Sequence, residues 1–195
     1  NSVASSINDV AQNTYKVTNN SMVKGEWYGS AFSVGRYIIT NRHVAKGSER
    51  VRLTDINGKT HETKILNISD QYDLAILESI GNKNKGIELC KDSNLSLMSP
   101  LYNIGNPRGE PFIITSGYFS GSKRPKPFNT NSDFIVHNLI GTQGQSGSAV
   151  IDFNNKCVVG VVTGLLSQSI VGFSIPVETL VEYIDIYEKS LIGVK

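Results

Sequence analysis

The sequence of 195 residues lacks the features that mark several classes of protein. No apolar run reaches the roughly 18 to 20 residues that a membrane-spanning helix needs. Neither sign of charge is in excess, because 19 Lys and Arg stand against 17 Asp and Glu for a net charge of +2. Because the positive and negative charges are nearly balanced, there is no electrostatic reason to expect nucleic-acid binding. We therefore expect neither a membrane span nor a nucleic-acid partner.

Cysteine and proline are also scarce. The 2 cysteines, Cys90 and Cys157, are too few for a disulfide framework, and neither has a Cys or His nearby at metal-ligand spacing. We expect each cysteine to be a small buried hydrophobic residue and not a nucleophile. Only 6 prolines accompany 18 glycines, and the glycines lie between short β-branched runs. This pattern is typical of an all-β protein with many tight turns.

Short strands separated by turn residues fill most of the chain, and their number and spacing favour a β-barrel or a β-sandwich. The strands are predicted at 28–34, 36–40, 50–54, 60–68, 73–77, 101–104, 112–120, 133–138, 148–152, 157–163 and 170–175. Helical spacing of apolar residues appears only near the two ends, at 2–13 and 176–191. The apolar stripe of the second helix is Val177, Leu180, Val181, Ile184 and Tyr187.

Three segments carry residue types that act together in acyl transfer. His43 follows the apolar strand of IITNRHVAKG, Asp73 opens the strand of QYDLAIL, and Ser146 lies in the glycine-rich turn of IGTQGQSGSAV. A serine hydroxyl is a poor nucleophile until an imidazole takes its proton, and that imidazole needs a carboxylate to fix its tautomer. The glycines let backbone N–H groups around residues 144–146 face the oxyanion of a tetrahedral intermediate. The chain order His, Asp, Ser belongs to the chymotrypsin arrangement.

At these residues the sequence resembles the trypsin-like serine proteases of the chymotrypsin fold, in their bacterial branch. TNRHVA resembles the TNxHV box of HtrA/DegP proteases and glutamyl endopeptidases, YDLAIL their DLAxL box, and GQSGSAV their nucleophile loop. YNIGNPRG and VGFSIPVETL are similar to further HtrA segments, so the resemblance covers nearly the whole chain. No PDZ domain follows, and we therefore expect a monomer instead of the assemblies of most HtrA enzymes.

The resemblance implies one protease domain over 1–195, built from two packed six-stranded antiparallel β-barrels at about 21–95 and 100–176. A short N-terminal helix and a closing helix at 176–191 complete it. The implied catalytic residues are Ser146 as nucleophile, His43 as general base and acid, and Asp73 as its orienting group. The oxyanion hole is assigned to Gly144, Gln145 and Ser146. No metal or organic cofactor is needed for this chemistry.

By analogy with the family, the walls of the primary specificity pocket are Ile140, Thr142, Val162, Thr163, Gly164, Leu165, Gly172 and Ser174. No acidic side chain lies in either wall, which disfavours Lys and Arg because their charge would be buried unpaired. The pocket is therefore expected to accept small or medium apolar residues. His137 or Thr142 could reach it, however, and would then favour an acidic or polar side chain. His61, in a polar strand, is expected at the surface.

The sequence thus predicts a serine endopeptidase acting on polypeptides, with a catalytically silent peptide-binding module on the same fold as the alternative. Because the chain begins with Asn, we expect a processed product that is secreted or at the surface of a bacterial cell, with a cytoplasmic location as the alternative.

Overall fold

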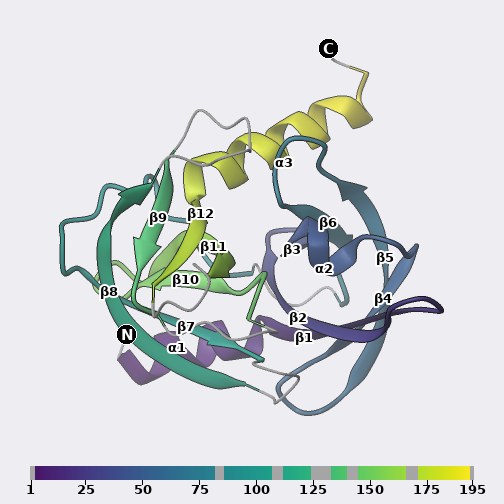
Figure 1. The fold of residues 1–195 in the computed structure, drawn as a ribbon, viewed down its shortest axis with the longest axis horizontal. Helices are drawn as coiled ribbons and strands as arrows, with labels where there is room; N and C mark the ends of the chain where they lie inside the picture. Colours follow the sequence, from purple (N-terminus) through teal and green to yellow (C-terminus); the bar gives the residue numbers. More distant parts are fainter. Residues whose placement is uncertain are drawn as a thin grey trace.

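The computed structural model describes residues 3–81, 86–106, 112–123, 133–139, 145–165 and 171–193, without the side chains of residues 3–5 and 165. Its strands close into two six-stranded barrels, and neighbouring strands in each barrel pair antiparallel (Figure 1). The two-barrel architecture that the family resemblance implies is therefore confirmed.

The first barrel has the strand order β1-β2-β3-β6-β5-β4. Its strands are β1 (Thr14–Ser21), β2 (Gly25–Val34), β3 (Tyr37–Thr40), β4 (Arg50–Thr54), β5 (Thr60–Ile68) and β6 (Ala75–Glu78). The alternation predicted for 50–54 places Val51 and Leu53 in the barrel interior, while Arg50 and Arg52 are exposed. A single turn of helix, α2 (Arg42–Ala45), follows β3. Sequence patterning does not reveal α2, because four residues are too few to show a helical period.

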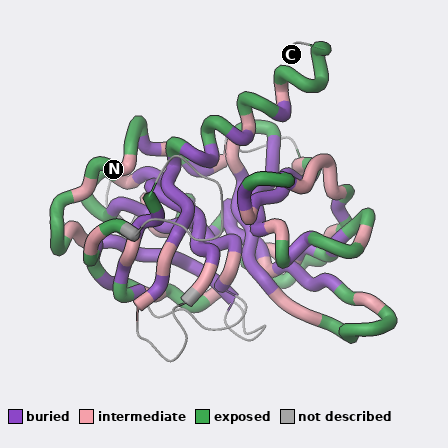
Figure 2. Tube along the Cα trace, turned by 45° about the horizontal axis from the view of Figure 1, so that its top comes forward, coloured by how far each residue is buried: buried purple, intermediate pink, exposed green. Residues whose placement is uncertain are grey.

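The second barrel has the strand order β10-β11-β12-β9-β8-β7. Its strands are β7 (Pro100–Gly105), β8 (Ile113–Lys123), β9 (Phe134–His137), β10 (Ala149–Asp152), β11 (Cys157–Leu165) and β12 (Gly172–Pro176). Both barrel interiors are buried, and the exposed positions include connecting loops, hairpin tips and the outer face of the C-terminal helix (Figure 2).

The first barrel begins earlier in the chain than its predicted boundary near residue 21. β1 starts at Thr14 and pairs with both β2 and β4. Its sequence, TYKVTNNS, has two asparagines of low strand propensity, which conceal the strand from propensity arguments. Asn19 is nevertheless buried, and its amide donates a hydrogen bond to the Val44 carbonyl of α2.

The terminal helices are α1 (Val3–Gln12) and α3 (Val177–Leu191), close to the predicted ranges. α3 runs along both barrels (Figure 1), and its Tyr183 and Tyr187 make edge-to-face contacts with Tyr72 and Tyr37 of the first barrel. The predicted apolar stripe is partly wrong, since Val181 is 48% exposed. The buried face of α3 turns instead through Val177, Thr179, Leu180, Tyr183 and Tyr187.

Cys90 and Cys157 form a disulfide, which the sequence analysis did not predict. Both are buried as predicted, but they are bonded across a sequence separation of 67. The bond ties the segment between the two barrels to the start of β11, where Cys90 N–H also donates to the Val158 carbonyl at 2.9 Å. Closing a loop of this length lowers the conformational entropy of the unfolded chain, which raises the free energy of unfolding by about 4 kcal/mol.

Within the described residues, no helix is long and apolar enough to cross a membrane.

Candidate active site

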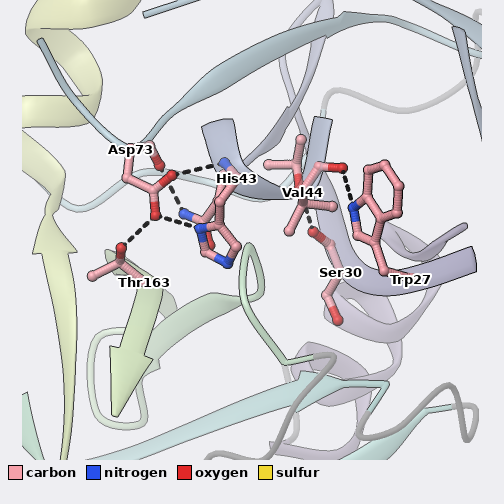
Figure 3. Close-up of polar contacts among 8 residues, drawn as sticks. Trp27, Ser30, His43, Val44, Asp73 and Thr163 are labelled. Atoms are coloured by element: carbon pink, nitrogen blue, oxygen red, sulfur yellow. Dashed lines mark hydrogen bonds and ion pairs between the residues drawn. The ribbon is translucent and has the colours of Figure 1, made fainter. Parts of the chain in front are cut away.

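His43 and Asp73 form a close pair at the junction of the two barrels (Figure 3). The imidazole Nδ1 lies 2.6 Å from Asp73 Oδ2, and the backbone N–H of His43 donates to Asp73 Oδ1 at 3.0 Å. His43 comes from α2, and Asp73 comes from the loop just before β6. The His43 side chain is 51% exposed while that of Asp73 is 12% exposed, so the imidazole is open to solvent and the carboxylate behind it is not.

Asp73 is held by hydrogen bonds from both barrels. The Thr163 hydroxyl of β11 donates to Oδ2 at 2.7 Å (Figure 3). The Asn41 amide donates to the Asp73 backbone carbonyl at 2.8 Å. Burial of Asp73 opposes its ionisation. Hydrogen bonds and attraction from His43, together with the Thr163 hydrogen bond, outweigh that burial and lower the pKa of Asp73 below its ordinary value. Asp73 is therefore ionised at neutral pH and available to stabilise a charged imidazole.

Ser146 lies in a tight turn of the second barrel that docks on the first barrel. Its carbonyl accepts a hydrogen bond from the backbone N–H of Ser30 in β2 at 2.8 Å. The next residue, Gly147, has φ +92° and donates its N–H to the Val162 carbonyl at 2.9 Å. A Cβ at Gly147 would lie 2.1 Å from the Ser30 carbonyl oxygen, so only glycine fits this close approach. The glycine after Ser146 is thus a requirement of the docked turn.

Ser148 closes the same turn with its side chain. Its hydroxyl donates to the Gln145 carbonyl at 2.7 Å and accepts from the Asn103 amide at 3.0 Å. The Thr115 hydroxyl in turn donates to Asn103 Oδ1. The buried Ser148 hydroxyl, through Asn103 and Thr115, therefore connects the turn with β7 and β8. Sequence reasoning missed Asn103 and Thr115, because nothing in the local pattern marks them.

Asn106 forms a second buried connection toward Ser146. Its backbone N–H and its amide both lie within hydrogen-bond reach of Ser30 Oγ, at 3.2 and 3.1 Å, and the amide also donates to the Tyr15 carbonyl at 3.3 Å. Because the Ser30 N–H binds the Ser146 carbonyl, Asn106 connects β7, β1 and β2 at the point where the serine turn docks.

The predicted pocket and oxyanion residues fall into two groups. Ile140, Thr142 and Gly144 lie outside the described residues, as does the side chain of Leu165. Of the others, Val162 packs in the core of the second barrel, and Thr163 bonds to Asp73. Gln145 is buried beside Ser146. Gly164 and Gly172 lie against the rings of Phe173 and His137, and Ser174 bonds to His137.

His137 is buried in β9, with 1% of its surface exposed. Its Nε2 lies 2.7 Å from Ser174 Oγ, and within the described part of the chain its Nδ1 has no hydrogen-bond partner. Burial lowers the pKa of His137 to about 4, so the ring is neutral at neutral pH. His61 is half-buried, with Nε2 at 3.4 Å from Asp55 Oδ2, and lies less at the surface than predicted.

Known proteins with similar sequences and structures support the resemblance drawn from the motifs. Residues 28–161 match the family described as trypsin-like peptidase domain. The chain is 33% identical over 151 residues to "Serine protease Do-like HtrB" of Bacillus subtilis (strain 168), covering 72% of this chain and 33% of that protein. It is 29% identical over 175 residues to "Protease Do-like 1, chloroplastic" of Arabidopsis thaliana, covering 83% of this chain and 39% of that protein.

A solved structure, "HtrA-type protease AlgW with tripeptide", has a TM-score of 0.83 and 25% identity, covering 95% of this chain and 63% of that one. The matched part of this chain spans between a third and two fifths of the length of the two curated relatives from Bacillus subtilis and Arabidopsis thaliana. The matched family range contains His43, Asp73 and Ser146. On this match the chain belongs to the trypsin-like peptidase family, and HtrA-type proteases are among its relatives.

Proposed function

We propose that this chain is a serine endopeptidase that hydrolyses peptide bonds with Ser146, His43 and Asp73. The His43–Asp73 pair carries the proposal, because a 2.6 Å contact at Nδ1 favours the imidazole tautomer with its proton on that nitrogen. In that tautomer Nε2 carries no proton and can accept the proton of the serine hydroxyl. The docking of the Ser146 turn on β2 supports the assignment. The hydrogen bond between Ser146 and Ser30 fixes the position of the turn relative to the barrel that carries His43.

In the proposed reaction Ser146 Oγ attacks the peptide carbonyl carbon while its proton passes to His43 Nε2. The N–H groups of Gly144, Gln145 and Ser146 stabilise the oxyanion of the tetrahedral intermediate. As the C–N bond breaks, the leaving amine takes the proton from His43, and an ester remains on Ser146. A water that gives its proton to the same imidazole then hydrolyses the ester, which releases the acid product and restores Ser146.

A fluorophosphonate probe tests this proposal against the alternative of a silent peptide-binding module. The probe phosphonylates an activated serine and releases fluoride. We expect one label per chain, located by mass spectrometry on the peptide that contains Ser146, and no label after heat denaturation. Ser148 lies two residues away with its hydroxyl already bonded to Gln145, and it serves as the internal comparison in the same peptide. A folded chain that takes no label would favour the binding module.

We further propose that the peptidase cuts after small or medium apolar residues. The predicted walls contain no acidic group to pair with Lys or Arg. His137 is neutral at neutral pH and so has no charge to pair with Asp or Glu. Peptides with Val, Ala, Leu or Ile before the scissile bond should therefore be cut at least about tenfold faster than peptides with a charged residue there, since burying an unpaired ion costs several kcal/mol.

A peptide library that varies only the residue before the scissile bond measures this preference. Glu as the dominant residue would contradict the apolar pocket and would point to His137 or Thr142 as the group that binds the substrate side chain.

We propose that the protein works outside the cytoplasm, secreted or at the cell surface. The Cys90–Cys157 disulfide supports this location, since such bonds persist in oxidising compartments.

A further inference from the structure

The carbonyl of Val44, the residue after His43, accepts two side-chain hydrogen bonds. Asn19 Nδ2 donates at 2.9 Å, and Trp27 Nε1 donates at 3.0 Å (Figure 3 shows Trp27). Carbonyls in the last turn of a helix have no partner within that helix, and Val44 lies in the last turn of α2. The two donors therefore satisfy a carbonyl that α2 itself leaves open.

Helix α2 cannot hold its own position. It is four residues long, and its few backbone bonds include those from Ala45 N–H to the Asn41 carbonyl at 3.2 Å and from Lys46 N–H to the Arg42 carbonyl at 2.8 Å. A single turn is unstable in water unless tertiary contacts fix it. The orientation of the His43 imidazole therefore depends on what α2 is attached to.

The β1–β2 hairpin provides one attachment, beside those that Asn41, Arg42 and His43 make to the segment 69–73. Asn19 and Trp27 lie directly opposite each other in its register, so both donors come from one cross-strand pair. The orientation of the Asn19 amide is fixed, because its Oδ1 accepts from the Ser48 hydroxyl at 2.7 Å and from the Asn20 N–H at 2.9 Å. Asn19 is also buried, with 3% of its surface exposed.

The side chain of Val44 is held by the same hairpin. A Cβ placed on Gly29 of β2 would lie 2.5 Å from Val44 Cγ1. The Val44 side chain therefore packs in the space that is open because Gly29 has no side chain. The residue after His43 is thus fixed through its carbonyl and its side chain together. On its other side His43 is fixed by Asp73, through its N–H and its Nδ1.

We propose that Asn19 and Trp27 are positioning residues that hold His43 in register with Asp73 by fixing the Val44 carbonyl. The inference rests on the proposed peptidase function. When both donors are lost, the buried carbonyl must move to reach water, and α2 and the imidazole move with it. A shift of about 1 Å in a catalytic group can lower turnover by about 100-fold.

Two variants remove the donors with little change of shape. Trp27→Phe removes the indole N–H and keeps an aromatic ring, and Asn19→Asp removes the amide N–H and keeps the oxygen that Ser48 and Asn20 contact. We expect each to lower kcat by about 3- to 10-fold and the double variant by about 100-fold, with KM within about twofold of the unchanged protein. A proton on Nδ1 in the short bond to Asp73 resonates far downfield in the NMR spectrum, and we expect that signal to broaden or disappear in the double variant.

Tyr28→Phe is the matched control, because Tyr28 lies between Trp27 and Gly29 on β2 and its hydroxyl donates to Glu26. It should leave kcat and the downfield signal unchanged. The inference is overturned if the fall in kcat follows only the fraction of unfolded protein, measured by circular dichroism at the assay temperature. It is also overturned if KM rises while kcat stays constant, or if Tyr28→Phe has the same effect. The NMR signal needs no turnover, so it tests the positioning role even if the unchanged protein fails to cut peptides or take a fluorophosphonate label.

Discussion

Replacing Ser146 with alanine is expected to lower peptidase turnover by about 10³- to 10⁶-fold while the fold stays intact. The loss follows from the proposed chemistry, because the nearby Ser148 hydroxyl is buried and bonded to the Gln145 carbonyl and so cannot replace Ser146 as the nucleophile. The fold is expected to survive because Ser146 contacts the first barrel through its backbone carbonyl, which alanine retains. Initial rates on a fluorogenic peptide and thermal melting by circular dichroism measure the two effects.

Ser120→Ala is the control for that experiment. It removes an exposed hydroxyl whose bond to the Tyr118 carbonyl is long, at 3.3 Å, and it should change neither the rate nor the melting temperature. Turnover in Ser146→Ala at the level of the unchanged protein would contradict Ser146 as the nucleophile.

Asp73→Asn is expected to lower kcat/KM by about 10³- to 10⁴-fold at neutral pH. Asp73 accepts hydrogen bonds from His43 Nδ1, from the His43 backbone N–H and from Thr163. An asparagine that keeps its oxygen on the His43 backbone N–H must place its NH₂ group at the position of Oδ2, toward Nδ1, where the Thr163 hydroxyl can only accept a hydrogen bond. That arrangement places the imidazole proton on Nε2, where it blocks the transfer of the Ser146 proton.

The neighbouring Asp70 supplies a matched control for that variant. Its side chain is fully exposed and lies 3.8 Å from Arg42, so Asp70→Asn removes the same charge from the same loop without touching His43. We expect its kcat/KM to stay within about twofold. Equal losses in the two variants would mean that local charge, and not the contact with His43, explains the effect of Asp73→Asn.

The sequence predicted the barrels well and parts of their surroundings poorly, for a physical reason. Alternating patterns such as that of Arg50–Thr54 report which side of a strand is buried, and such strands agree with the structure. β1 breaks the pattern because Asn19 is buried for its hydrogen bonds and not for its hydrophobicity. The pairing of Cys90 with Cys157 likewise depends on contacts between distant segments, which no local pattern contains.

The residues of the candidate site were likewise predicted only in part from the sequence. His43 and Asp73 are recognisable from their motifs, and the structure brings them together. Thr163 was predicted as a pocket wall from its place in the sequence, but its hydrogen bond to Asp73 could not be predicted, because only the packing of the two barrels brings them together. Asn103 and Asn106 are ordinary residues near the end of a strand until the fold supplies Ser148 and Ser30 as their partners.

The Cys90–Cys157 bond also turns part of the chain into a covalent ring. Strands β7, β8, β9 and β10 and Ser146 lie inside this ring, whereas His43 and Asp73 lie outside it. A single cut of the backbone between the two cysteines opens the ring but separates no fragment. The piece that carries Ser146 stays joined to the rest of the chain through a peptide bond or through the disulfide. A nicked molecule can therefore keep both halves of its candidate active site, and only a second cut or reduction of the bond would let them part.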